Sequence, residues 1–218
     1  MITLPSYSQL DSKWSQTKMQ PSGYTLGEEG CLVTSAAMAF ANFGINVTPD
    51  ELCNKLNVAG GFDGTGMMNL KTMETIYSSI MELDREYTTL ATFAPVSKVD
   101  IHEAINRITR LICLGIPVCL NVNKGTHWIV AWDLDGPNDF VITDALNGKS
   151  SNLSTAYDYA DKSIVGYQAW IGAPISFPNP DKGGLPSDGV CAWKLSQCIK
   201  GINSYQYLRE AFQNLTLP

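Results

Sequence analysis

The sequence predicts an α+β fold in which N-terminal helices pack on an antiparallel sheet, followed by a C-terminal helical extension. Apolar residues recur at helical spacing before Gly115 and alternate with a period of two after it. The later segments are joined by short turns, and short connections favour antiparallel pairing of neighbouring strands. Helices followed by strands are typical of the α+β class.

Helix signals are concentrated in the first half of the chain. The arm Leu4–Gly30 is polar and rich in turn residues, so no helix is expected there. The run from Cys31 to Phe43 is apolar nearly all round and stops at Gly44, which predicts a buried helix closed by a glycine. Three more helices are expected: from Pro49 to about Leu56 behind the capping box Thr48-Pro49-Asp50-Glu51, near Asn69 to Met81, and from Asp100 to about Leu114.

Strand signals follow Gly115 and are separated by turn residues. The expected strands are Val118–Val122, His127–Asp133, Phe140–Thr143 and Ser163–Ile171. The hairpin between the second and third strands should place Thr143 and Asp144 roughly opposite His127 and Thr126. We therefore expect one domain over residues 1–171, a Pro- and Gly-rich linker or loop over 172–189, and a helical appendage over 190–218.

The composition limits the classes of partner and compartment. Fifteen basic residues against 21 acidic ones give a net charge of −6 at pH 7, so no basic field would gather nucleic acid. No apolar run reaches the roughly 18 residues of a membrane span, and the start of the chain lacks the regions of a signal peptide. We expect a chain that is cytoplasmic as synthesised, with lysis or a phage particle as routes of release.

Metal and cofactor motifs are absent from the sequence. Six cysteines are scattered without a Cys-x-x-Cys pair, and they are interpreted as free thiols rather than as a disulfide framework or a zinc site. The Gly60–Gly66 loop lacks the Gly-Lys-Ser/Thr ending of a phosphate-binding loop, and Asp133–Asp139 lacks the downstream Glu of an EF-hand. No metal and no cofactor is expected.

Three residues could form a nucleophilic site. Cys31 opens a buried helix, where the unpaired N–H groups and the helix dipole favour a negative charge on sulfur; the alternative is a small, packed thiol. His127 opens a strand and could serve as the base, whereas His102 lies in the first turn of a helix and is expected to be solvated. Asp144 ends the next strand and could orient the imidazole, or it could simply form a turn.

The arrangement of these residues resembles a known family. The motifs Gln9-x-Asp11-x-x-Trp14, Gly30-Cys31-x-x-Thr34-Ser35-x-x-Met38 and Thr48-Pro49-x-x-Leu52, with His127 and Asp144 far downstream, resemble the papain-like cysteine peptidases of the double-glycine, bacteriocin-leader-processing group and their stand-alone relatives. The resemblance spans roughly residues 4 to 150. It implies a papain-like fold in which Cys31 is the nucleophile, His127 its base, Asp144 the orienter and Gln9 a donor to the oxyanion.

Two departures from the family pattern concern these residues. Ala145 follows Asp144, where many members have proline, and the glutamine lies farther from the nucleophile than in many papain-like enzymes, with Gln20 and Gln9 as the nearest candidates. The backbone N–H of Cys31 can supply one oxyanion donor in either case.

The sequence thus favours cysteine-dependent hydrolysis of a peptide or amide bond through a thioester, with peptides or peptidoglycan stem peptides of a bacterial or phage setting as substrates. One alternative is a non-catalytic binding or structural module whose aromatic surface is formed by Trp128, Trp132 and Trp170. Another is an acyl transferase that uses the same thioester. The C-terminal helix could dock a protein partner.

Overall fold

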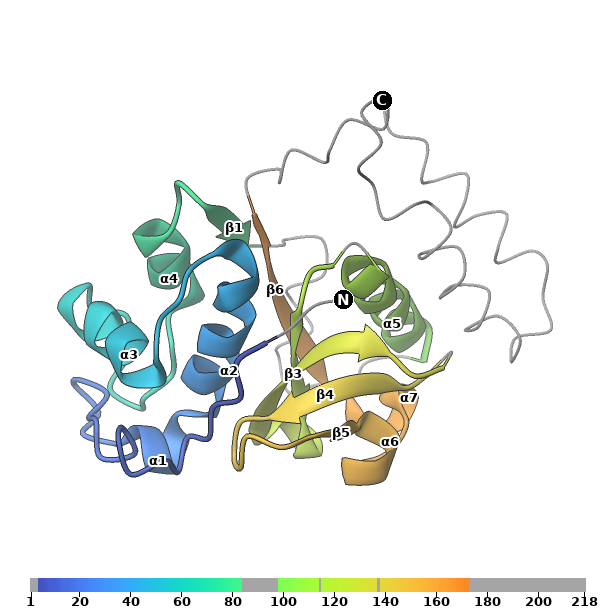
Figure 1. Cartoon of the computed structure of the whole chain (residues 1–218), viewed down its shortest axis with the longest axis horizontal. Coiled ribbons are helices and arrows are strands. Elements are labelled where there is room, and N and C mark those ends of the chain that lie inside the picture. Colours follow the sequence, from blue (N-terminus) through green and yellow to red (C-terminus); the bar gives the residue numbers. More distant parts are fainter. Residues whose placement is uncertain (1–3, 84–97, 114, 137, 173–218) are drawn as a thin grey trace.

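The computed structural model describes residues 4–83, 98–113, 115–136 and 138–172, which form two halves (Figure 1). The first half contains the helices α1 (Leu26–Glu29), α2 (Cys31–Phe40), α3 (Pro49–Val58) and α4 (Leu70–Ile76). The second half contains the strands β1 (Met81–Leu83), β2 (Val118–Val122), β3 (His127–Leu134), β4 (Phe140–Asp144), β5 (Ser150–Asn152) and β6 (Gly166–Gly172). Helices α5 (Lys98–Cys113), α6 (Leu153–Ala156) and α7 (Ala160–Ser163) lie among these strands in the sequence.

The strands form one sheet in the order β1-β6-β2-β3-β4-β5. Every described pair is antiparallel. Helices therefore precede most of an antiparallel sheet, as the change of hydrophobic period predicts, and the α+β class is confirmed.

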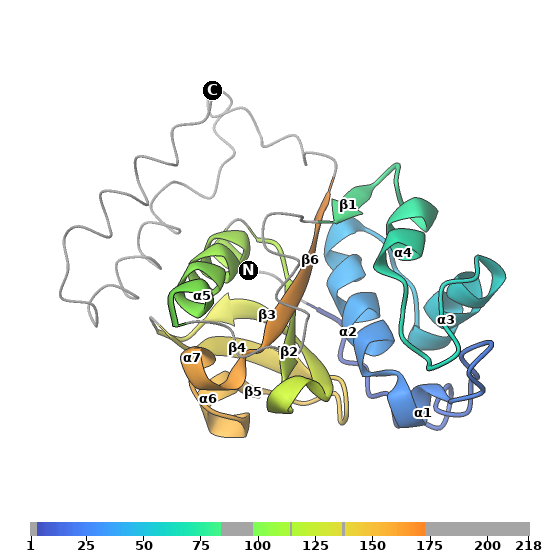
Figure 2. The same cartoon turned by 180° about the vertical axis from the view of Figure 1, so that it is seen from behind.

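The sheet is covered on both faces. Helices α2 and α5 lie on opposite sides of it, as Figure 2 shows on either side of β6. The core on the α2 side includes Phe40 and Trp170, whose rings meet edge to face at 5.0 Å. The core on the α5 side includes Ile108 and Ile129. Because successive side chains of a strand point to opposite faces, one strand serves both cores: Val130 of β3 belongs to the first and Ile129 to the second.

The two helices with the strongest terminal signals have the predicted starts. α2 begins at Cys31 and continues as a 3-10 turn, Ala41–Phe43, to Gly44, which adopts the left-handed conformation with φ 76°. α3 begins at Pro49 behind Thr48, whose backbone N–H donates to Glu51 in the predicted capping box. The helix α5 begins two residues before the predicted Asp100.

Two expectations about helices are wrong. The arm before Gly30 contains α1, because Thr25 and Glu28 form a second capping box. The backbone N–H and the hydroxyl of Thr25 both donate to the carboxylate of Glu28. The helix after Asn69, whose side chain caps α4, ends at Ile76, and Met81 instead opens the edge strand β1 paired with β6. Pairing with a distant strand decides the state of Met81, and no local signal carries that information.

The four predicted strands are present, and they differ from the predictions at one strand start and in one pairing register. The last strand starts at Gly166, since Ala160–Ser163 forms α7. Asp144 pairs with Ile129 and Thr143 with Val130, three residues from the predicted register. A bulge between Ala131 and Asp133 adds one residue to β3 and places Asp144 opposite Ile129 rather than Val130, so it brings the register one residue nearer to the predicted one. The strand β5 and the helix α6 were not predicted.

Some predictions fall on the rest of the chain. The linker beyond Gly172, the helical appendage over 190–218, Cys191 and Cys198 lie outside the described residues. Within the described ranges, no helix has the length and apolar character needed to cross a membrane.

Candidate active site

Cys31 is placed by the close approach of two consecutive helices. It is the first residue of α2, directly after Gly30, which separates α1 from α2. A Cβ atom on Gly30 would lie 2.4 Å from the carbonyl oxygen of Leu26, so only glycine allows this junction. The following residues of α2 are buried from Val33 to Phe40 and hold the helix in the core. The Cys31 thiol is therefore presented, partly exposed, at the N-terminus of a fixed helix.

His127 is the first residue of β3 and follows Thr126, which caps a tight 3-10 turn over Asn123–Gly125. Its Nε2 atom lies 2.7 Å from Oδ1 of Asp144, and the side chain is 15% exposed. Nε2 is occupied by the carboxylate, so Nδ1 is the nitrogen left for Cys31, whose interaction with the ring contributes to raising the pKa of His127. The imidazole thus stands between a carboxylate and a thiol.

Asp144 ends β4, one strand away from His127. It pairs with Ile129, and since alternate residues share a face, it is the diagonal neighbour of His127 on that face. Its carboxylate accepts three hydrogen bonds: from His127 on Oδ1, from the backbone N–H of Leu146 on Oδ1 at 2.8 Å, and from the hydroxyl of Tyr157 on Oδ2 at 2.6 Å. The carboxylate is therefore held in one orientation toward the imidazole.

The electrostatics of the pair favour charged partners. Burial alone would lower the pKa of His127, but hydrogen bonds to Asp144 and Cys31, together with the charges of both groups, raise it to about 9. Burial alone would raise the pKa of Asp144, but its hydrogen bonds with His127, Tyr157 and the Leu146 backbone hold that pKa below the usual 3.8. At neutral pH the site therefore contains an imidazolium beside a carboxylate.

Gln9 is buried in the arm before α1 and reaches the same region. Its backbone N–H donates to the carbonyl of Ala145 at 2.7 Å, directly after Asp144. Its side-chain Nε2 donates to the carbonyl of Gly27 at 3.1 Å, one turn before Cys31. Gln9 therefore links the segment after Asp144, through its backbone N–H, to α1 just before Cys31, through its carboxamide. By contrast, Gln20 is exposed, so Gln9 is the better placed of the two candidate oxyanion donors.

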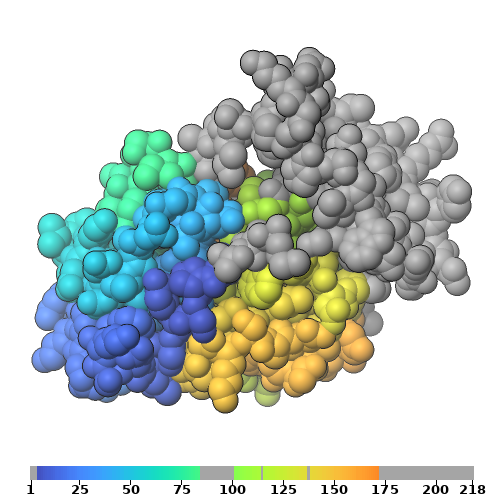
Figure 3. Space-filling view, in the orientation of Figure 1, coloured from blue at the N-terminus to red at the C-terminus, as the bar shows by residue number. Residues whose placement is uncertain are grey.

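The early motif explains how Gln9 is held. Trp14 is buried, and its Nε1–H donates to the carbonyl of Ser8 at 2.7 Å, directly before Gln9. The carbonyl of Asp11 accepts from the backbone N–H of Trp14, which closes the turn between the two motif residues. In Figure 3 this dark blue segment lies along the junction between the helices and the strands. The motif thus holds Gln9 in contact with both the helical half and the sheet half of the fold.

The other described thiols differ from Cys31. Cys53 and Cys119 are both buried. Burial raises the pKa of Cys53 to about 12. Burial also raises the pKa of Cys119, and the charge of Cys31 raises it further. Cys113, at the end of α5, is partly exposed but belongs to the opposite side of the sheet from α2. His102 is exposed on α5, as predicted. Among the described residues, no group of three or more potential ligands is arranged around a metal position.

The aromatic surface of the alternative interpretation is wrong in one member. Trp170 is completely buried and packs against Phe40, so it cannot face a partner. Trp128 and Trp132 are partly buried, and Nε1 of Trp132 donates to the hydroxyl of Thr143 within the sheet. These three tryptophans do not form one exposed surface.

Sequence reasoning missed Tyr157, which follows α6 and donates to Asp144. It belongs to none of the motifs, and its contact with Asp144 depends on how α6 folds back on β4. No local sequence signal could have found it.

A thiol, an imidazole and a carboxylate in this order are the groups that cysteine peptidases use. A family model described as the Peptidase_C39-like family matches residues 1–172. The chain therefore belongs to this family of cysteine peptidases, which confirms the resemblance seen in the motifs. No curated protein and no solved structure matches the chain.

Proposed function

We propose that this chain hydrolyses peptide or amide bonds through a thioester on Cys31. The observation that carries the proposal is the position of the His127 ring, which bonds to Asp144 through Nε2 at 2.7 Å and has Cys31 as its other partner. The raised pKa of His127 keeps the ring protonated at neutral pH, and a protonated ring stabilises a neighbouring thiolate. The sulfur then has a cationic partner before substrate arrives.

In the first half of the reaction, the thiolate of Cys31 attacks the carbonyl carbon and the carbonyl oxygen becomes an oxyanion. The backbone N–H of Cys31 at the start of α2 and the second N–H of the Gln9 carboxamide are the donors proposed for that oxygen. The imidazolium of His127 then transfers its Nδ1 proton to the leaving nitrogen as the C–N bond breaks. An amine leaves, and the acyl group remains on sulfur as a thioester.

In the second half, neutral His127 removes a proton from water, and the resulting hydroxide attacks the thioester. The second oxyanion collapses, the C–S bond breaks, and the acid leaves while the thiolate and the imidazolium are restored. Asp144 remains a carboxylate throughout and stabilises the ring each time it is charged. The fold proposed for this chemistry is papain-like, with the site at the junction of the helical and sheet halves.

Peptides, including peptidoglycan stem peptides, are the proposed substrates. The test compares the wild-type chain with Cys31→Ala on a peptide panel and on purified cell wall, with Cys113→Ala as a matched control that removes a partly exposed thiol elsewhere. Cleavage by the wild type and by Cys113→Ala, together with its loss in Cys31→Ala, is the expected result. Equal cleavage by wild type and Cys31→Ala would refute the proposal.

The thioester is tested separately. Mass spectrometry of acid-quenched wild-type reactions should show the mass of the acyl fragment on the peptide that contains Cys31, and a nucleophilic amine added to the reaction should not accumulate as an acylated product. Accumulation of acylated amine in preference to free acid would assign the chain to the acyl transferases instead.

A further inference from the structure

Among the described residues, Tyr157 is the side chain that bonds to the Asp144 carboxylate without belonging to the family motifs. Its hydroxyl donates to Oδ2 of Asp144 at 2.6 Å, while Oδ1 faces Nε2 of His127 at 2.7 Å. The two carboxylate oxygens therefore have different donors: His127 and the Leu146 backbone N–H on Oδ1, and the phenol on Oδ2. The tyrosine ring also lies beside the imidazole, with ring centroids 6.4 Å apart and planes inclined by 33°.

The short helix α6 fixes the position of this phenol. Leu153 at its start is fully buried in the core on the α5 side, and the backbone N–H of Ser154 donates to Oδ1 of buried Asp139 at 2.9 Å. The hydroxyl of Ser154 donates to the other oxygen of Asp139. The backbone N–H of Tyr157 in turn donates to the carbonyl of Leu153 at 2.8 Å. Tyr157 is thus anchored to the start of β4 while its hydroxyl bonds to the end of the same strand.

We propose that Tyr157 is a positioning residue that sets the orientation of Asp144 and limits the negative charge that this carboxylate presents to His127. Only the kinetic test of this inference rests on the proposed hydrolysis. A donor on Oδ2 withdraws electron density from the carboxylate and, together with the Leu146 backbone N–H on Oδ1, keeps Oδ1 directed at Nε2.

The charge state of the phenol supports this role. Burial, the hydrogen bond to Asp144, and the charges of Asp144 and Cys31 all raise the pKa of Tyr157, so its hydroxyl remains a donor over the whole working range of pH. Among the described residues, the titratable groups that face this carboxylate are His127 on β3 and Tyr157 after α6, with Cys31 on α2 beyond the imidazole.

The expected consequences follow from removing the hydroxyl alone. In Tyr157→Phe the ring and its packing remain and Oδ1 keeps its bonds from His127 and the Leu146 backbone, but the carboxylate keeps its full negative charge beside the imidazole. The pKa of His127 should therefore rise, and kcat/KM at pH 7 should fall about tenfold with most of the loss in kcat. A residue with only a packing role would lower stability without moving the titration of His127.

The experiment combines NMR and kinetics on the full chain. The ring pKa of His127 is measured by NMR in wild type, in Tyr157→Phe and in Tyr159→Phe, a control that removes a hydroxyl from an exposed tyrosine two residues away. An upward change in the His127 pKa of Tyr157→Phe alone supports the inference. An unchanged or lowered His127 pKa, or an equal change in Tyr159→Phe, would overturn it.

Two further measurements separate the outcomes. The NMR readout needs no catalysis, so a wild type without peptidase activity would overturn the proposed function and leave the role of Tyr157 to be judged on the His127 titration. If Tyr157→Phe does not fold, 13C-labelled tyrosine in the wild-type chain gives the answer: Tyr157 should titrate above the ordinary value of 10. Titration at or below that value would overturn the inference.

Discussion

Replacing Asp144 by asparagine removes one negative charge and leaves the side-chain volume nearly unchanged. His127 has a pKa of about 9 against an ordinary 6.5, and this difference corresponds to about 3 kcal/mol in favour of the charged ring. The side chains of His127 and Asp144 are only 15% and 14% exposed, so solvent screens the interaction little. A large part of this energy should disappear in Asp144→Asn, because the hydrogen bond to Asp144 is the largest cause that raises the pKa of His127; among the described residues, Cys31 is the other group that contributes.

The expected result is a change in both rate and pH profile. A loss of about 3 kcal/mol corresponds to a fall on the order of a hundredfold in kcat/KM at pH 7. The alkaline limb of the kcat/KM profile should lie near pH 9 in the wild type, since the imidazolium loses its proton there, and should move toward pH 6.5 in Asp144→Asn. The assay is initial-rate hydrolysis of a fluorogenic peptide from pH 5 to pH 10.

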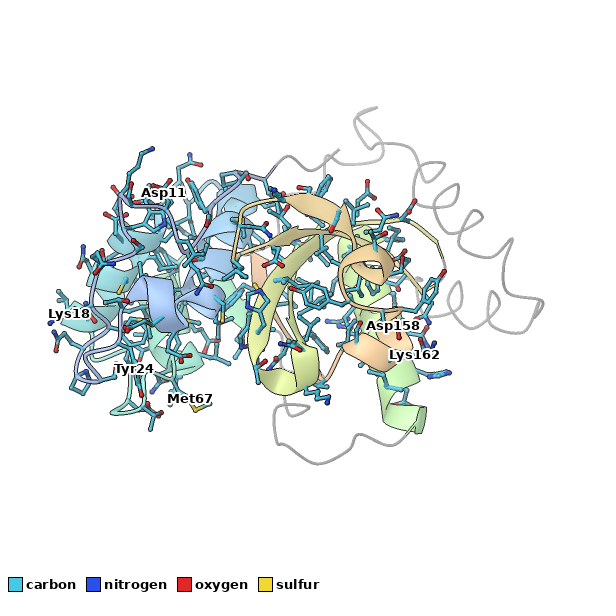
Figure 4. All side chains as sticks on the ribbon, turned by 90° about the horizontal axis from the view of Figure 1, so that it is seen from below. Asp11, Lys18, Tyr24, Met67, Asp158 and Lys162 are labelled. Carbon is cyan, nitrogen blue, oxygen red and sulfur yellow. The ribbon has the colours of Figure 1, made fainter. Side chains whose placement is uncertain are left out.

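The matched control is Asp158→Asn, which makes the same change of charge. Asp158 lies 3.7 Å from Lys162 in an exposed ion pair, and such pairs contribute at most about 1 kcal/mol. In Figure 4 this pair lies over α7, far from Asp11, Lys18, Tyr24 and Met67 over the helical half. The control should retain wild-type kinetics. An Asp144→Asn enzyme with kcat/KM within threefold of wild type and an alkaline limb still near pH 9 would refute the reasoning.

Three further outcomes are expected. Gly30→Ala should destabilise the chain by about 1 to 3 kcal/mol in urea unfolding and slow iodoacetamide labelling of Cys31, because the new methyl group would overlap the preceding turn; wild-type stability would contradict the close approach. Gln9→Ala should lower kcat by about a hundredfold or more with a smaller change in KM, as for loss of an oxyanion donor; a change in KM alone would count against that role. The raised pKa of His127 contributes stability to the folded state that is complete below pH 6.5 and is lost as the pH rises through 9. The Tm of the wild type should therefore decline over that interval relative to the Tm of His127→Gln. Parallel Tm curves for the two proteins would disprove the linkage.

Local chemistry explains what could be predicted from the sequence. The start of α2 at Cys31, its end at Gly44 and the start of α3 at Pro49 each depend on residues within one helical turn, and all three agree with the structure. The strand Val118–Val122 agrees for the same reason, because turn residues bound it on both sides. The candidates Cys31 and His127 were found because each stands at such a boundary.

Only the tertiary structure decided how these elements meet. The sequence by itself determined the longer helices and strands, but not α1, β1, β5, α6 or α7, and it offered Cys31, His127, Asp144 and Gln9 as site residues. Three contacts depend on how separate segments of the chain come together in the fold. They are the bulged pairing that places Asp144 opposite Ile129, the hydrogen bond between Gln9 and Ala145, and the contact of Tyr157 with the Asp144 carboxylate. Such contacts are fixed by packing and pairing energies that no single segment contains, since each needs the whole sheet and its two covering layers in place.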